Sequence, residues 1–184
     1  MAEKSYHNGK KPPKKISKAY LENAALYYLQ RYATSAANLK RVLMRKVKRS
    51  CAFHQADADD FAPLVDELVI RYTSVGLLDD KSFAVARVTS LRRQGLSRQA
   101  ITAKLQVKGL TVSQIENALH AVDEEHEEPE MDAAIAYAKR KKLGPWRKKP
   151  LTDPPRDRQK EMAAMGRAGF SLEMARKALE NKNS

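Results

Sequence analysis

The chain has 184 residues, a formal net charge of +13, and few glycines and aromatic residues. Its many Ala, Leu, Lys, Arg and Glu residues favour helix, and its single cysteine excludes a disulfide framework and a multi-cysteine zinc site. No apolar run reaches membrane-spanning length and no signal peptide pattern opens the chain, so we expect a cytoplasmic protein.

The positive charge lies mainly in the two ends of the chain. Residues 1–56 carry thirteen Lys and Arg against two acids, and residues 57–122 are balanced. Residues 123–132 carry seven acids and no Lys or Arg, whereas residues 133–184 carry fourteen Lys and Arg against five acids. This distribution is typical of a body that binds a polyanion such as nucleic acid. A solvated basic surface that only aids solubility is the alternative.

In chain order, the first predicted feature is a basic arm over residues 1–15, rich in Lys and Pro, which we expect to be disordered. A first helix begins near Ser17, and its expected inward residues are Tyr20, Ala24, Tyr27 and Leu29. A second helix is capped by Thr34 or Ser35, and its apolar stripe is Leu39, Val42, Leu43 and Met44. A third helix runs from about Phe61 to Ser74 and ends before Gly76.

The second half of the chain predicts six more helices. Asp79 or Asp80 caps a fourth helix that contains Phe83 and stops near Gly95, and Ser97 caps a fifth that includes Ile101, Leu105 and Val107. A sixth helix starts at Thr111, and a seventh covers about Met131 to Leu143. The last two span roughly 156–168 and 171–181.

An internal repeat links two of these helix starts. The segment Gly109–Leu119 reappears as Gly169–Leu179, with a glycine, an apolar residue, a Ser or Thr, and an amphipathic run ending in Ala-Leu. The glycine suits the left-handed position that ends a helix. Thr111 then predicts a capping box with Gln114, and Ser171 predicts the cap of the second copy. Such repeats indicate stacked units that present a binding surface.

Together these elements predict an all-α fold of nine helices grouped in threes. The expected organisation is a basic arm at 1–15, three-helix repeats at 16–76, 77–123 and 131–184, an acidic linker at 124–130, and a Pro-rich insertion at 144–155 within the third repeat. The residues assigned structural roles in turns, caps and packing are Gly76, Asp79, Asp80, Phe83, Gly95, Gly109, Thr111, Gly169 and Ser171.

No catalytic, metal or cofactor site is expected. The chain has no phosphate-binding Gly-x-x-x-x-Gly-Lys loop, and its four histidines lack partners for a catalytic triad. Cys51 and His54 have zinc-like spacing without a second pair, and the acids at 57–60 lack a calcium loop's glycine, since Ala62 stands at that position. Residues 95–119 could form a helix-turn-helix, but the second helix would present an acid and no cation to DNA, so simple helix packing is favoured.

An ordered series of motifs spans most of the chain. It comprises Gly76-Leu77-Leu78-Asp79-Asp80-x-x-Phe83-Ala84, Arg92-Arg93-x-Gly95, Arg98, Leu105-x-x-Lys108-Gly109-Leu110 and Arg167-Ala168-Gly169-Phe170-Ser171. In this series, over roughly residues 17–181, the sequence resembles the RecX family of bacterial regulators of RecA recombinase. It departs from the family at Leu96-Ser97, where Gly-Pro is frequent, at Ser82, where a basic residue is common, and in the 144–155 insertion.

The resemblance implies an elongated, curved array of three tandem three-helix repeats. It also implies a non-enzymatic modulator, chiefly an inhibitor, that binds the RecA–DNA filament and restrains its growth, ATP hydrolysis and strand exchange in DNA repair, homologous recombination and the SOS response. We expect the protein to be a monomer. A general nucleic-acid-binding or nucleoid protein acting without RecA is the alternative function.

Exposed cations are the candidate contacts to single- or double-stranded DNA and to the filament. They are Lys40, Arg41, Arg45, Lys46 and Lys48 on the second helix; Arg92, Arg93, Arg98 and Lys104 centrally; and Lys139, Arg140, Lys141, Lys142, Arg147, Lys148 and Lys149 towards the end. The alternative for each is ordinary solvated helix surface. Trp146 either stacks on a base or a partner, or packs against the third repeat.

Overall fold

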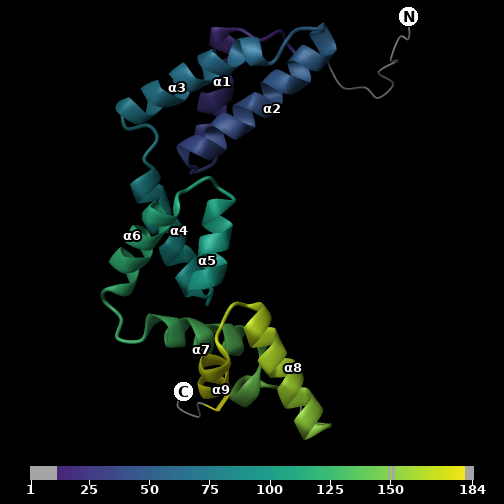
Figure 1. The fold of residues 1–184 in the computed structure, drawn as a ribbon, viewed down its shortest axis with the longest axis vertical. Coiled ribbons are helices and arrows are strands. Elements are labelled where there is room, and N and C mark those ends of the chain that lie inside the picture. Colours follow the sequence, from purple (N-terminus) through teal and green to yellow (C-terminus); the bar gives the residue numbers. More distant parts are fainter. Residues whose placement is uncertain (1–11, 149, 151, 181–184) are drawn as a thin grey trace, which may run out of the picture. The chain divides into compact units, whose positions relative to one another are not determined.

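A computed structural model describes residues 12–148, 150 and 152–180 of the chain. These residues form nine α-helices and two short 3₁₀ helices, with no strand among them (Figure 1). The predicted all-α class and its three-helix groups are therefore confirmed. The chain divides into two compact units, Met1–Leu78 and Asp79–Ser184. None of the described helices combines the length and apolar character needed to cross a bilayer.

The described part of the first unit consists of three α-helices around one core. Its elements are α1 (Lys18–Leu29), α2 (Ala36–His54), the 3₁₀ helix η1 (Asp59–Phe61) and α3 (Ala62–Ser74). Ser17 and Ser35 begin α1 and α2 as N-caps, since each hydroxyl accepts a backbone N–H three residues on. The buried residues of this core are Leu21, Ala25, Leu39, Leu43, Val47, Cys51, Val65, Leu68, Tyr72 and Leu78.

The inward face of α1 differs from the sequence prediction. Leu21 and Ala25 are buried, whereas Tyr20 and Leu29 are only partly buried and Tyr27 is 60% exposed. Residues four apart lie on the same helix face, so burial of Leu21 carries Ala25 inward and leaves Tyr27 outside. The prediction that Tyr27 faces the core was wrong.

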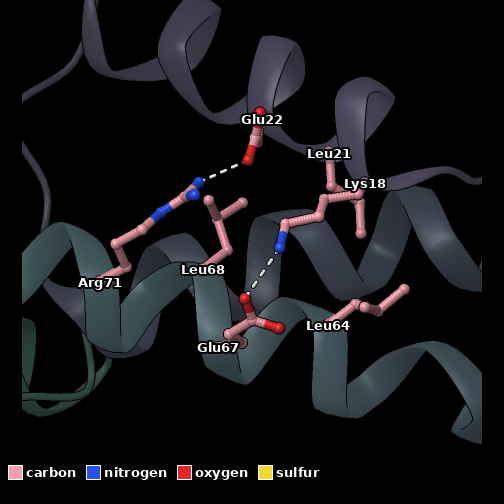
Figure 2. Close-up of a pocket in the computed structure, with 7 residues that line it drawn as sticks. All are labelled: Lys18, Leu21, Glu22, Leu64, Glu67, Leu68 and Arg71. Carbon is pink, nitrogen blue, oxygen red and sulfur yellow. Dashed lines mark hydrogen bonds and ion pairs between the residues drawn. The ribbon is translucent and has the colours of Figure 1, made fainter.

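Two ion pairs flank the contact between α1 and α3 (Figure 2). Lys18 Nζ lies 2.9 Å from Glu67 Oε1, and Arg71 donates to Glu22 Oε1 at 2.5 Å. Leu21, Leu64 and Leu68 line the seam that these pairs border. Both pairs are solvent-exposed, so each contributes at most about 1 kcal/mol and the apolar seam holds the helices together.

The predicted disordered arm falls partly outside the described residues, which begin at residue 12. Its last described residues lie against α2: the carbonyl of Lys14 accepts from Ser50 Oγ at 2.7 Å, and that of Pro13 accepts from His54 Nε2 at 2.8 Å. Residues 13 and 14 are thus held by side chains near the end of α2.

The second unit contains six α-helices around two cores. They are α4 (Asp80–Arg93), α5 (Arg98–Gln106), α6 (Val112–Asp123), α7 (Pro129–Lys141), α8 (Pro154–Arg167) and α9 (Leu172–Glu180), with the 3₁₀ helix η2 (Gly144–Trp146) between α7 and α8. Helices α4 to α6 enclose the buried residues Phe83, Ala84, Val88, Leu91, Ile101, Leu105, Leu110, Ile115, Ala118 and Leu119. Helices α7 to α9 enclose Ala133, Ala134, Ala138, Met165, Phe170, Ala175 and Ala178.

The helix starts of this unit agree closely with the sequence. Asp79 and Ser97 are N-caps, and Thr111 and Gln114 form the predicted capping box. Helix α7 begins at Pro129, two residues before the predicted Met131, because proline is tolerated in the first turn of a helix. Val107 was expected within the fifth helix together with Ile101 and Leu105, but it is the C-cap of α5 and is exposed.

Close backbone contacts join the two three-helix groups of the second unit. Gly95 has φ of +70°, and a Cβ added there would lie 2.5 Å from the backbone N of Tyr137 in α7. Ser97 Oγ donates to the carbonyl of Ala168 at 2.6 Å. Only a residue without a side chain fits where α7 approaches Gly95. This junction fixes the positions of α4, α5, α7 and α8 around the groove described below.

Candidate polyanion-binding surfaces

The outer side of α2 is the cationic surface of the first unit. Its apolar residues Leu39, Leu43 and Val47 turn into the core, so the cations between them remain in solvent. These exposed cations are Lys40, Arg41, Arg45, Lys46, Lys48 and Arg49. We call this set the α2 cationic face. A helix with so many like charges on its exposed surface gains from an anionic partner.

Intramolecular partners are few on the α2 cationic face. Lys40 forms an ion pair with Asp66 of α3, and Arg41 donates to Asn38 Oδ1 at 2.7 Å. Arg45, Lys46 and Lys48 form no ion pair with any other residue that the structure describes. Their charges are therefore available to an external anion.

A second cationic surface lies in the second unit, in a groove of about 520 Å³ between its two three-helix groups. Five cations from four helices line it: Arg87 from α4, Lys104 from α5, Arg140 and Lys141 from α7, and Arg167 from α8. The other described residues that line it are apolar, small or neutral, and none of them is acidic. We call this site the cationic groove.

The electrostatics of the cationic groove favour a polyanion. None of the five cations forms an ion pair with another described residue of the unit, and the Arg140 guanidinium lies 5.5 Å from the centre of the Tyr137 ring. Arginine presents paired N–H donors that match the geometry of phosphate oxygens. Each neutralised phosphate also releases condensed counterions, so binding here would weaken with salt.

The sequence predicted only part of this groove. Lys104, Arg140 and Lys141 were candidate contacts, and the fold brings all three together. Arg87 and Arg167 were missed as contacts because each stands at least five residues from the next cation of its helix, and the two lie eighty residues apart in the chain. No local pattern marks them, since only the contact between the two helix groups makes them neighbours.

Arg92, a predicted contact residue, is bound by carboxylates of the protein itself. Its guanidinium donates to both carboxylate oxygens of Asp123, at 2.6 and 3.0 Å, and to Glu130 Oε2 at 2.6 Å. Burial opposes its charge, but the hydrogen bonds to Asp123 and Glu130 outweigh burial and raise the pKa of Arg92. Its side chain is only 10% exposed, so its charge is neutralised within the fold.

Other predicted contacts also have intramolecular partners or lie away from the groove. Arg98 pairs with Glu116, and Arg147 pairs with Glu161 at 2.6 Å. Arg93 is exposed on a different hollow, whose lining includes Asp123, Glu125 and Asp132. Lys139, Lys142 and Lys148 are exposed but do not line the cationic groove, and Lys149 lies outside the described residues.

Two residues that could bind or react, Trp146 and Cys51, are packed against cores of the fold. Trp146 is partly buried against the core of α7 to α9, which agrees with its predicted packing role. Cys51 is buried in the first unit, and burial, followed by the nearby carboxylates of Asp57 and Asp60, raises the pKa of its thiol. No set of three His, Cys, Asp or Glu side chains gathers in metal-binding geometry within the described parts of the chain.

Comparisons with known proteins point to one family. The sequence model described as RecX, second three-helix domain, matches residues 79–119. Regulatory protein RecX of Myxococcus xanthus (strain DK1622) is 40% identical over 179 residues, covering 97% of this chain and 94% of the relative. Regulatory protein RecX of Agrobacterium fabrum (strain C58 / ATCC 33970) is 30% identical over 162 residues, covering 88% of this chain and 82% of the relative. No solved structure matches the chain significantly. With relatives this similar over nearly its whole length, the chain belongs to the RecX family of regulatory proteins.

Proposed function

We propose that this protein is a non-enzymatic regulator of RecA recombinase that acts in the cytoplasm as an inhibitor. It binds the RecA–DNA filament and restrains filament growth, ATP hydrolysis and strand exchange. RecA as the partner comes from the family resemblance. The cationic groove supports a phosphate-bearing target, since its described lining gathers five cations and no acid.

The mechanism follows from charge and shape rather than from covalent chemistry. The cationic groove and the α2 cationic face each receive DNA phosphates or acidic filament surfaces. Binding that spans protein and DNA would hold the filament in one state and so slow steps that require subunits to be added or to turn over. Loss of three phosphate contacts to a single strand reduces the slope of log affinity against log salt by about 2.

The test is ATP hydrolysis by preformed RecA filaments on single-stranded DNA, with this protein titrated in and an unrelated DNA-dependent ATPase as control. Selective loss of RecA turnover, at protein levels far below those that coat the DNA, is the expected result. Equal suppression of both enzymes, abolished by modest salt, would instead identify a general nucleic-acid-binding protein.

A pair of variants tests the cationic groove. Arg87→Gln/Arg140→Gln/Arg167→Gln removes three groove charges. The matched control, Arg156→Gln/Arg158→Gln/Arg176→Gln, removes three exposed arginine charges of the same unit that do not line the groove. We expect the groove variant to inhibit RecA at least tenfold less strongly than the control. Equal inhibition by the two variants would remove the groove from the mechanism.

The α2 cationic face has its own test. Reversing Arg45, Lys46 and Lys48 to Glu is expected to weaken filament binding and to leave the helix content by circular dichroism unchanged, because all three side chains point into solvent. Unchanged binding would exclude this face from the contact surface.

A further inference from the structure

The end of α1 and the residues that follow it expose two aromatic rings. Tyr27 is 60% exposed and Tyr32 is 56% exposed, and Tyr28 and Arg31 lie between them in the sequence. Aromatic rings commonly contribute their large area to a core or to an interface. These two rings contribute little to the core of the first unit, whose buried residues on α1 are Leu21 and Ala25.

Two ring contacts hold these side chains in place. The Arg31 guanidinium lies 3.6 Å from the centre of the Tyr27 ring and donates to the Tyr27 carbonyl at 3.1 Å. The Tyr28 and Tyr32 rings are 5.0 Å apart between centres and tilted by 41°. The Tyr28 hydroxyl accepts from Asn38 Nδ2 at 3.2 Å, which anchors the second pair to α2. The exposed faces are therefore preorganised.

The charge beside the rings is positive. Arg31 has no carboxylate partner among the residues that the structure describes. Asn38, which donates to the Tyr28 hydroxyl, also accepts from Arg41, so the pair of Tyr28 and Tyr32 adjoins the start of the α2 cationic face. Aromatic faces beside a cationic helix suit nucleic acid, in which bases alternate with phosphates. Only a single strand offers unstacked bases to such faces.

We propose that Tyr27, Arg31 and Tyr32 form a platform on which bases of single-stranded nucleic acid stack while the α2 cationic face contacts the phosphates. Every base offers a π-face, so the platform selects for single strands and not for a particular sequence. The proposal does not depend on the regulation of RecA, because the platform binds the strand directly.

The test measures direct binding by fluorescence anisotropy without RecA, using a labelled 15-mer of thymidine, an abasic strand of equal length and a 15-base-pair duplex. Tyr27→Ala/Tyr32→Ala removes both rings, and the control Tyr27→Phe/Tyr32→Phe keeps their faces. We expect the alanine variant to bind the thymidine strand roughly tenfold or more weakly. Its affinities for the abasic strand and the duplex should match those of the unsubstituted protein, and the phenylalanine variant should bind all three normally.

Other outcomes would overturn the platform. Unchanged affinity of the alanine variant for the thymidine strand would exclude base stacking, and equal losses on all three probes would assign the effect to phosphate binding or folding. We expect the alanine variant to keep its circular dichroism spectrum and melting temperature, because both rings are exposed. These two measurements exclude misfolding as the cause of weaker binding. If the alanine variant loses RecA inhibition but keeps its strand affinity, the rings contact protein, and the stacking proposal fails while the proposed function stands.

Discussion

Replacing Arg92 by Met tests whether this arginine stabilises the fold or contacts DNA. Arg92 joins the end of α6 to the start of α7, because Asp123 and Glu130 both accept its hydrogen bonds. Methionine keeps much of the side-chain length and removes the charge. The Asp123 side chain, 12% exposed, would then lose its cationic partner.

The expected cost follows from these contacts. Removing one partner of a buried ion pair costs about 3–5 kcal/mol, because the remaining charge stays desolvated. Glu130 is partly solvated and also accepts the backbone N–H of Arg98, so it keeps a partner and the lower end of the range applies. We expect a loss of about 3 kcal/mol, which lowers the melting temperature by roughly 6–12 °C in a chain of this size.

The assay is thermal unfolding followed by circular dichroism, combined with DNA binding at a temperature where the variants are folded. Arg93→Met is the matched control, since this neighbouring arginine is exposed and should change stability by no more than about 0.5 kcal/mol. Adding Asp123→Leu to Arg92→Met should recover part of the loss, because it removes the unpaired carboxylate. A normal melting temperature with weakened DNA binding for Arg92→Met would refute the reasoning and make Arg92 a contact residue.

Three further predictions concern the second unit. Gly95→Ala should lower the melting temperature by at least 5 °C, because φ is positive at Gly95 and the added Cβ would clash with α7. The control Gly166→Ala should not destabilise the protein, because a Cβ there meets no atom within 4 Å. In chemical denaturation, Ser97→Ala should lower the free energy of unfolding by about 2 kcal/mol, because Ser97 caps α5 and also donates to the Ala168 carbonyl. Thr111→Ala, which removes only a cap, should lower it by about 1 kcal/mol, and equal losses would contradict the role of the Ala168 contact. The hydrogen bonds to Asp79, first from the Ser82 hydroxyl and then from backbone N–H groups, lower its pKa. The charged Asp79 cap therefore stabilises the fold fully above the ordinary carboxyl pKa of about 3.9, and this stabilisation is lost as the pH falls through the lower pKa of the folded state. The difference in free energy of unfolding between the unsubstituted protein and Asp79→Ala should thus narrow below about pH 4, and a constant difference would contradict this.

Local sequence signals determined the helices of this protein. Serine, threonine and aspartate caps, glycines with positive φ and apolar periodicity act over three to five residues, so the N-caps Ser17, Ser35 and Ser97 and the capping box at Thr111 were predictable. The family resemblance was likewise contained in the order of short motifs. The face of α1 was not predictable, because its inward side depends on which neighbours α1 meets, and so Tyr27 was misplaced.

Only the tertiary structure decided which cations share a surface. Charge counts along the chain cannot distinguish Arg92 from Arg87. Packing of α4 against α6 and α7 gives Arg92 two carboxylate partners, whereas Arg87 faces a groove whose described lining holds no carboxylate. Likewise, the contact between the two helix groups brings Arg87 and Arg167 to one groove across eighty residues of chain. The sequence by itself determined the helices and the net charge, which are local or additive properties. Where that charge is exposed or neutralised depends on contacts between distant residues, and these exist only once the helices have packed.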